Sequence, residues 1–373
     1  MYSVTKQAVV PRRQCTAALE GGAVSGIGPG RRRQVCVRYW CFIALAVLSG
    51  GSAQAQDDDW AWVSGALVST AQGITEPDLS QSGSGTSKTF ALDLYFQRQW
   101  ANNEVFAYLW ASEGDPVLYA ATATAGGLSY GQIQVLSAYA SRTLFDFLTV
   151  TVGKIYPTAF FDNNMFANNG YSQFQAYSFI NNQTIYFPFP NLGYVIELTG
   201  GEVFAFRFTS VEESEEEQDT ALQDERFVAA EMALSYFLAD EYAGNFRLGL
   251  WHSGLQSLTG FYASIDQEFG LFSGLFARAG MVNGTLDDNI RFAYSAGVEI
   301  GFLDGHRVGI AYESQTPADF ATFDTQSWFE GYVSFALSGD VTLTGDIQFI
   351  VNGDYDPDIE PFAVYGLRFY FPF

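Results

Sequence analysis

The chain is poor in the residues on which disulfide scaffolds, redox sites and many active sites depend. It has three cysteines, at positions 15, 36 and 41, and two histidines in 373 residues. Beyond residue 41 no thiol is available for a disulfide, a lipid anchor or redox chemistry. Lys and Arg number 18 against 41 Asp and Glu, so the chain has little positive charge to offer to phosphates. These absences exclude a disulfide scaffold and argue against a nucleic-acid partner.

Long apolar runs are also missing after residue 55. The one marked run, at 39–48, follows an arginine cluster at 31–33 and precedes Ala53-Gln54-Ala55, which is the layout of a secretory signal peptide. The run is too short for a spanning helix, which needs about 20 residues. We therefore predict that residues 1–55 are a cleaved signal peptide with an extra N-terminal extension, and that 56–373 form one exported domain. Cleavage removes seven Lys and Arg and one Glu, which leaves 11 basic and 40 acidic residues and a formal charge of −29.

Almost every segment after residue 56 alternates apolar and polar residues with a period of two, which is typical of strands. In 340–350, Val341, Leu343 and Ile347 share one phase, whereas Thr342 and Asp346 share the other. Such alternation fits a soluble sandwich with its apolar face inside or a membrane barrel with that face outside. Sixteen strands are predicted: 60–70, 88–100, 103–112, 128–141, 146–154, 193–199, 201–210, 226–237, 244–253, 258–268, 270–282, 290–301, 305–314, 327–338, 340–350 and 361–373.

Strand length and aromatic placement favour the barrel. Most segments match a tilted membrane strand of roughly 9–11 residues better than a soluble strand of about 5–6. Aromatic residues crowd the strand ends in the manner of a membrane-interface girdle. We therefore predict an all-β, antiparallel transmembrane β-barrel of about 16 strands. The residues interpreted as the girdle are Trp60, Trp62, Trp100, Trp110, Trp251, Trp328, Tyr370 and Phe371.

The connections alternate in length, as they do in bacterial barrels, where short turns face the periplasm and long loops the outside. Short turns such as 101–102 and Gly200 follow even-numbered strands, and the longest connection, 155–192, follows the fifth. That segment holds eleven aromatic residues, seven Asn, three Gln and one charged residue, Asp162. Exposing a loop with so many aromatic residues to solvent is unfavourable. We expect it to be a third extracellular loop that folds into the lumen and narrows the pore.

Aromatic rings and side-chain amides suit an uncharged, hydroxyl-rich solute, because amides both donate and accept hydrogen bonds. Arg207, Arg247 and Arg278 lie in the inward phase, where a guanidinium fork can hold two hydroxyls or attract an anion. Two plainer interpretations stay open: the rings only pack the loop against the wall, and the inward charges only neutralise one another. The predicted solute path in the loop comprises Tyr156, Phe160, Phe161, Asp162, Asn163, Asn164, Phe166, Asn168, Tyr171, Phe174, Asn181 and Asn182.

From Val152 onward the chain resembles the carbohydrate-selective porins, the family named for the glucose porin of pseudomonads. The stretches that carry the resemblance are 152–169, 179–194, 259–270, 274–280, 342–358 and 364–373. Residues 56–145 depart from the family's usual Gly- and Asp-rich first strands. The resemblance implies a sixteen-stranded outer-membrane barrel that passes monosaccharides or related solutes.

The last strand ends in an apolar phase that closes on Phe373, which resembles the signal read by the barrel-assembly machinery of the outer membrane. We therefore expect a Gram-negative outer-membrane porin in contact with lipid and lipopolysaccharide, without enzymatic activity, cofactor or metal site; homo-oligomerisation stays open. One alternative is a general or cation-favouring porin, because the mature chain is so acidic. A remoter one is an outer-membrane hydrolase, for which His252 would need an activated serine beside it.

Overall fold

The computed structural model describes residues 59–79, 85–114, 116–118, 121, 133–214, 225–239, 241–270, 273–284, 290–302, 305–318 and 323–373. The predicted signal peptide lies outside these ranges, as do residues 215–219 of an acidic segment that begins at Glu212. Within them the chain forms sixteen strands: β1 (Asp59–Ile74), β2 (Thr86–Trp100), β3 (Asn103–Glu113), β4 (Ile133–Leu144), β5 (Leu148–Ile155), β6 (Asn191–Gly200), β7 (Phe204–Glu212), β8 (Arg226–Leu238), β9 (Tyr242–Ser253), β10 (Leu258–Gly270), β11 (Ser273–Asn283), β12 (Ile290–Phe302), β13 (His306–Pro317), β14 (Gln326–Ser338), β15 (Val341–Val351) and β16 (Phe362–Pro372).

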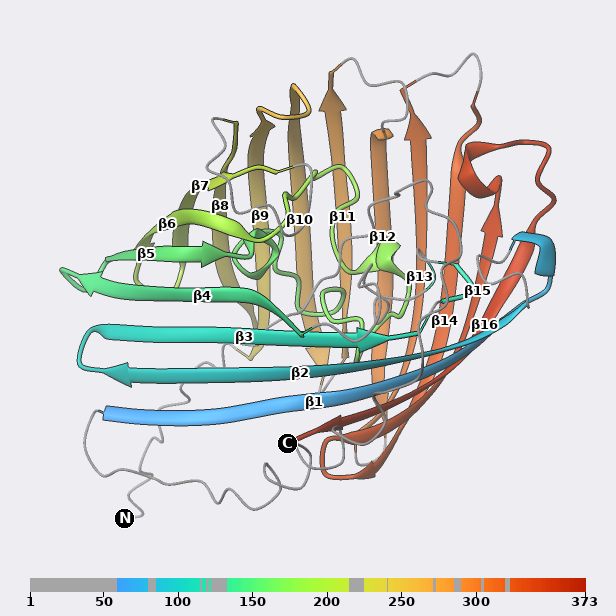
Figure 1. The fold of residues 1–373 in the computed structure, drawn as a ribbon, viewed down its shortest axis with the longest axis horizontal. Coiled ribbons are helices and arrows are strands. Elements are labelled where there is room, and N and C mark those ends of the chain that lie inside the picture. Colours follow the sequence, from blue (N-terminus) through green and yellow to red (C-terminus); the bar gives the residue numbers. More distant parts are fainter. Residues whose placement is uncertain are drawn as a thin grey trace, which may run out of the picture.

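The strands form one closed antiparallel barrel (Figure 1). Each strand pairs with its sequence neighbours, and β1 pairs with β16 from Ala66 opposite Pro372 to Ile74 opposite Val364. Closure leaves no unpaired sheet edge, which is what a strand protein in lipid requires. Among the described residues no helix is long and apolar enough to cross a membrane. The predicted all-β barrel of sixteen strands is confirmed.

The two phases of each strand face opposite sides of the wall, as the period-two alternation predicts. The apolar phase faces outward: Leu250, Ile310 and Ile347 are 59%, 62% and 59% exposed. The polar phase faces inward, where Glu313 and Gln348 are buried. An apolar exterior around a polar interior is the arrangement of a membrane barrel and the inverse of a soluble sandwich.

The connections differ at the two ends of the barrel. Those after even-numbered strands are two or three residues long, whereas the connection between β5 and β6 runs from 156 to 190. In the turn after β4, Phe145 and Asp146 both have positive φ, of 57° and 61°, as a tight hairpin turn between twisted strands requires. The turn predicted at Gly200 lies at 201–203 instead, because β6 continues through Gly200 and the chain reverses at Gly201, where φ is 66°.

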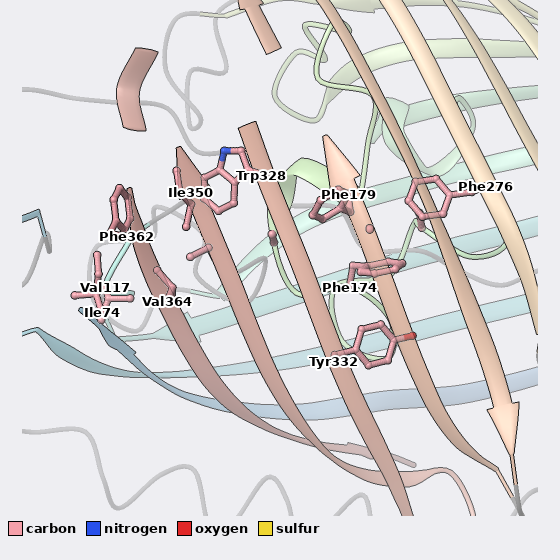
Figure 2. Packing of buried hydrophobic residues seen from close by; sticks show 14 of the residues in the cluster. Ile74, Val117, Phe174, Phe179, Phe276, Trp328, Tyr332, Ile350, Phe362 and Val364 are labelled. Atoms are coloured by element: carbon pink, nitrogen blue, oxygen red, sulfur yellow. The ribbon is translucent and has the colours of Figure 1, made fainter. Parts of the chain in front are cut away.

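The girdle interpretation was wrong for several of the large aromatic residues. Trp110, Trp251 and Trp328 are each 2% exposed and belong to buried clusters inside the barrel. Their position in the inward phase directs them towards the 156–190 segment rather than towards lipid. Figure 2 shows one such cluster, in which Phe174 and Phe179 of that segment lie beside Phe276 of the wall. The apolar content of the loop is therefore used to attach it to the inner face of the barrel.

Candidate functional site

The 156–190 segment crosses the space enclosed by the strands (Figure 1). It contains two short 3-10 turns, η3 (Pro157–Ala159) and η4 (Tyr177–Phe179), so its backbone makes few internal hydrogen bonds. Buried backbone groups need partners from elsewhere. Charged side chains of the wall supply them, from β8, β10, β11, β14 and β16, which are distributed around the barrel.

Arg278 of β11 holds the loop with all three nitrogens of its guanidinium group. Its Nη1 donates to the Phe179 carbonyl at 2.8 Å, and its Nη2 donates to the carbonyls of Asp162 and Ile180, both at 3.2 Å. Its Nε donates to the Asp162 carboxylate at 3.2 Å. The guanidinium is 3% exposed. Its fork therefore holds the loop and is not open to a passing solute.

Asp162 is the loop's one charged residue, and it lies at the centre of this attachment. Its side chain is fully buried, and its φ is 55°. Its carboxylate also accepts the Asn182 N–H at 2.6 Å, and its own N–H donates to Glu231 at 2.9 Å. Burial raises the pKa of the Asp162 carboxyl, whereas the nearby Arg278 guanidinium lowers it. The charge of Asp162 therefore depends on Arg278.

A second attachment holds the middle of the loop. Arg368 of β16 donates to the carbonyls of Gly170 and Gln173, both at 2.6 Å. Glu330 of β14 accepts the N–H groups of Gln175 and Ala176 at 2.5 and 2.9 Å. Cation-to-carbonyl and carboxylate-to-amide hydrogen bonds are charge-assisted and stronger than neutral ones. The loop is thus fixed from two sides by buried charges.

Glycines in the wall make room for loop side chains. A Cβ built on Gly274 would overlap the Phe166 ring, and one on Gly280 would overlap the Thr184 hydroxyl. By contrast, a Cβ on Gly345 would meet nothing within 4 Å. Close packing of this kind tolerates little added volume, so these positions fix how deeply the loop lies in the barrel.

A cavity of about 830 Å³ lies beside the loop. It reaches residues 241–242 and 270, next to the short turns between β8 and β9 and between β10 and β11. The loop contributes part of its lining and the strands contribute the rest. The lining includes Tyr95, Phe106, Tyr108, Tyr139, Tyr156, Phe160, Asn163, Asn164, Phe166, Asn168, Glu197, Arg207, Arg247, Glu299 and Arg307.

One side of this cavity is aromatic. Tyr108 and Tyr95 stack with ring centroids 4.7 Å apart, and Phe106 and Tyr139 stack at 5.1 Å. Tyr95 and Phe106 are 6.3 Å apart, and Phe160 of the loop continues the series 5.8 Å from Tyr139. These five rings form a continuous stripe over β2, β3, β4 and the loop, which we call the aromatic stripe.

Buried carboxylates hold two of the stripe's hydroxyls. The Tyr108 hydroxyl donates to Asp93 at 2.7 Å, and the Tyr139 hydroxyl donates to Glu104 at 3.4 Å. Rings held at their tips as well as by stacking keep their orientation. The stripe is therefore a fixed apolar surface inside an otherwise polar lumen.

Arginines and acids line the other side of the cavity, and they pair with one another. Arg207 contacts Glu197 at 2.5 Å and Glu231 at 3.1 Å. Arg247 contacts Asp266 at 2.5 Å, and Arg307 contacts Glu299 at 3.5 Å. We call this part of β6, β7, β8, β9, β10, β12 and β13 the ionic wall. Each of its arginines has an acidic partner, and the cavity is also lined by the acids Glu241 and Glu268.

The predicted solute-path residues divide into two groups. Those that line the cavity are Tyr156, Phe160, Asn163, Asn164, Phe166, Asn168, Arg207 and Arg247. The others lie in the packing and anchoring of the loop, where they are buried: Phe161, Asp162, Tyr171, Phe174, Asn181, Asn182 and Arg278. For the first group, contact with solute stays a prediction. For the second, burial favours the interpretation that the loop residues pack against the wall.

Sequence reasoning missed the part of the aromatic stripe that lies on the strands. These residues, Tyr95, Phe106, Tyr108 and Tyr139, are spread over three strands and share no sequence motif. A signal was present: these aromatics occupy the polar phase of three consecutive strands, where lipid contact cannot explain them.

Chemistry of other kinds finds little support among the described residues. No three His, Cys, Asp or Glu side chains there come together as a metal cluster. His252 is on the exposed face of β9, and its Nδ1 lies 3.1 Å from the Thr259 hydroxyl. The hydrolase alternative needs an activated serine beside His252, whereas the hydroxyl at this distance belongs to a threonine.

Comparison with known proteins gives a likeness in fold. No protein-family model and no curated protein matches the chain. Among solved structures, OprB of Pseudomonas putida at high pH is 12% identical, with a TM-score of 0.71 over 84% of this chain and 94% of that one. The low-pH OprB structure is 13% identical, with a TM-score of 0.56 over 91% and 98% of the two chains. A variant of the Rhodopseudomonas blastica porin is 14% identical, with a TM-score of 0.58 over 83% of this chain and all of that one. The chain therefore has the fold of these porins.

Proposed function

We propose that the protein is a passive outer-membrane channel for small, uncharged, hydroxyl-rich solutes, of which sugars are the best fit. The observation that carries the proposal is the composition of one cavity: the aromatic stripe on one side and the self-paired ionic wall on the other. A pyranose has C–H faces that pack on rings and hydroxyls that bond to amides and charged groups. The resemblance of residues 152–373 to the carbohydrate-selective porins agrees with this solute class.

The anchored loop gives the channel its selectivity. It occupies the lumen with a neutral, amide-rich surface, so an ion that entered would lose hydration against a loop that offers it no charge. A neutral solute loses less on entry and gains contacts with the stripe. We also infer that the chain is exported by a cleaved signal peptide, assembled through its Phe373 strand and embedded in the lipid of a Gram-negative outer membrane, where it contacts lipopolysaccharide.

Liposome swelling tests the proposal. Glucose and glucuronate share a ring and differ by a carboxylate, so their relative rates of entry report charge rather than size. We expect glucose to enter several-fold faster through the purified protein. Equal rates would support the alternative of a general porin, for which the formal charge of −29 after cleavage is the motivation.

A further inference from the structure

Behind the loop, on the wall made by β14, β15, β16 and β1, buried polar side chains form a linked cluster, which we call the ring. The Nε2 atoms of Gln72 and Gln348 both donate to the Ala121 carbonyl, at 2.9 and 2.8 Å. Gln348 Nε2 also donates to Asp346 at 2.9 Å. These contacts join β1 to β15 through a residue of the connection between β3 and β4.

The loop contributes the other part of the ring. The carboxyl groups of Asp346 and Glu330 lie close enough to interact, and Glu330 accepts the Gln175 N–H at 2.5 Å. The Gln175 amide points back to Gly366, lying 3.3 Å from the place a Cβ would occupy there. Gly366 is the cross-strand partner of both Gln72 and Asp346. The Gln175 amide therefore lies over Gly366, on the strand between Gln72 and Asp346.

Four oxygens of this ring have no hydrogen-bond donor: Gln72 Oε1, Gln175 Oε1, Gln348 Oε1 and Asp346 Oδ2. Gln175 and Gln348 are fully buried, and Gln72 and Asp346 nearly so. Buried polar atoms are almost always satisfied, so a group of unpartnered acceptors on linked side chains of the loop and the wall indicates a ligand. Apolar residues two positions along the same strands, Ile74, Ile350 and Val364, belong to the buried cluster that Figure 2 shows.

The chemistry of the oxygens identifies the ligand class. Two adjacent buried carboxyl groups repel each other, and the nearby Arg368 guanidinium offsets only one of their two charges. A proton would satisfy one oxygen and leave the three amide oxygens without partners. Carboxylate and amide oxygens together are the ligand set of hard cations such as Ca²⁺, which also retain water. Arg368 Nε and Gln175 Nε2, the orphaned donors nearby, suit such waters.

We propose that the ring of Gln72, Gln175, Glu330, Asp346 and Gln348 binds a hard metal cation, Ca²⁺ or Na⁺, which ties the loop to the barrel wall. The site has two carboxylates rather than three and takes its other ligands from amides, as Ca²⁺ sites commonly do. It lies between the loop and the wall, so it does not depend on which solute passes through the cavity.

Equilibrium dialysis against ⁴⁵Ca²⁺ after chelator treatment tests the site on the intact detergent-solubilised protein. Asp346→Asn keeps the shape of the side chain and removes its charge. Glu313→Gln is the matched control, since Glu313 is also a buried inward acid with an orphaned oxygen but lies on β13, outside the ring. We expect wild type and Glu313→Gln to bind one more Ca²⁺ per barrel than Asp346→Asn.

A second measurement, in sodium, distinguishes Na⁺ from Ca²⁺ as the bound cation. If Na⁺ is the ligand, calcium binding will be equal in all three proteins. Replacing choline chloride by NaCl will then raise the thermal midpoint of wild type and Glu313→Gln by several degrees, but not that of Asp346→Asn. The inference is overturned if both measurements give the same values for wild type and Asp346→Asn, because the ring then holds only protons and water.

A second variant keeps the test decisive if Asp346→Asn does not fold, as judged by heat-modifiable gel mobility. Gln175→Glu adds a carboxylate to the ring without removing a side-chain hydrogen bond, because both amide atoms of Gln175 are unpartnered. It should strengthen Ca²⁺ binding about tenfold, because affinity in oxygen sites follows the charge of the ligands. Unchanged affinity in this folded variant would contradict a cation at this position.

Discussion

The two sides of the cavity contain different residues and use them differently. On β2, β3 and β4 the rings of the aromatic stripe face the cavity, and the acids behind them, Asp93 and Glu104, hold their hydroxyls. On the ionic wall the charges face one another, as Arg207 does with Glu197 and Glu231. Acidic residues therefore orient aromatic rings on one side of the cavity and pair with arginines on the other. What a lumen residue does is decided by its partners and not by its facing the lumen.

Arg278→Ala should have the largest effect, because it removes the anchor that joins the ionic side of the barrel to the loop. The change leaves Asp162, 0% exposed, without its ion pair, and breaking such a buried pair costs about 3–5 kcal/mol. We expect a lower free energy of unfolding and a larger, noisier single-channel conductance. Urea unfolding and planar-bilayer recording measure the two.

Arg278→Lys serves as the comparison variant for that experiment. Lysine keeps the charge but lacks the fork that reaches the carbonyls of Asp162, Phe179 and Ile180. An intermediate conductance is expected. If Arg278→Ala conducts like wild type, the loop does not depend on this anchor.

Gly274→Val should disturb the loop's packing without touching a charge. The added side chain meets the Phe166 ring, and overpacking of this kind costs about 1–3 kcal/mol. Gly345→Val is the matched control, because nothing lies within 4 Å of a Cβ there. The urea midpoint and the conductance should change for the first and not for the second; equal changes in both would show that the glycine makes no special room for the loop.

Tyr95→Leu tests whether the aromatic stripe contacts solute. Without this ring, the affinity with which glucose blocks the ion current should fall about fivefold, since one aromatic contact contributes about 1 kcal/mol. Phe96→Leu removes the neighbouring ring, which is 39% exposed in the outward phase, and should leave the block unchanged. A block unaffected by Tyr95→Leu would mean that sugars pass without using the stripe.

Arg207→Met should have the smallest effect, confined to ion selectivity. It leaves Glu197 and Glu231 without their shared partner at the cavity, so the local potential becomes more negative. The reversal potential in a KCl gradient should move a few millivolts towards cation selectivity. Arg98→Met, on the exposed outward phase of β2, is the control and should leave it unchanged, since a charge at the lipid side does not face the pore.

The sequence predicted the fold well because the alternation that makes a strand is local. The sixteen strands, their closure and the position of the long third connection all follow from period and loop length. The roles within the site depend on contacts between distant residues. Arg278 meets Asp162 across 116 positions, and Glu330 meets Gln175 across 155. Arg278 and Arg207 both lie in the inward phase of their strands. The period-two pattern therefore cannot show that Arg278 anchors the loop whereas Arg207 faces the cavity.

The most direct test compares the ratio of glucose to glucuronate entry, measured by liposome swelling, in the wild type and in Arg278→Ala. If the anchored loop is the selective element, the ratio will be well above one in wild type and will fall towards one when the anchor is removed, while the total rate rises. A ratio that is already one in wild type, or that is unchanged when Arg278→Ala raises the conductance, would contradict the account.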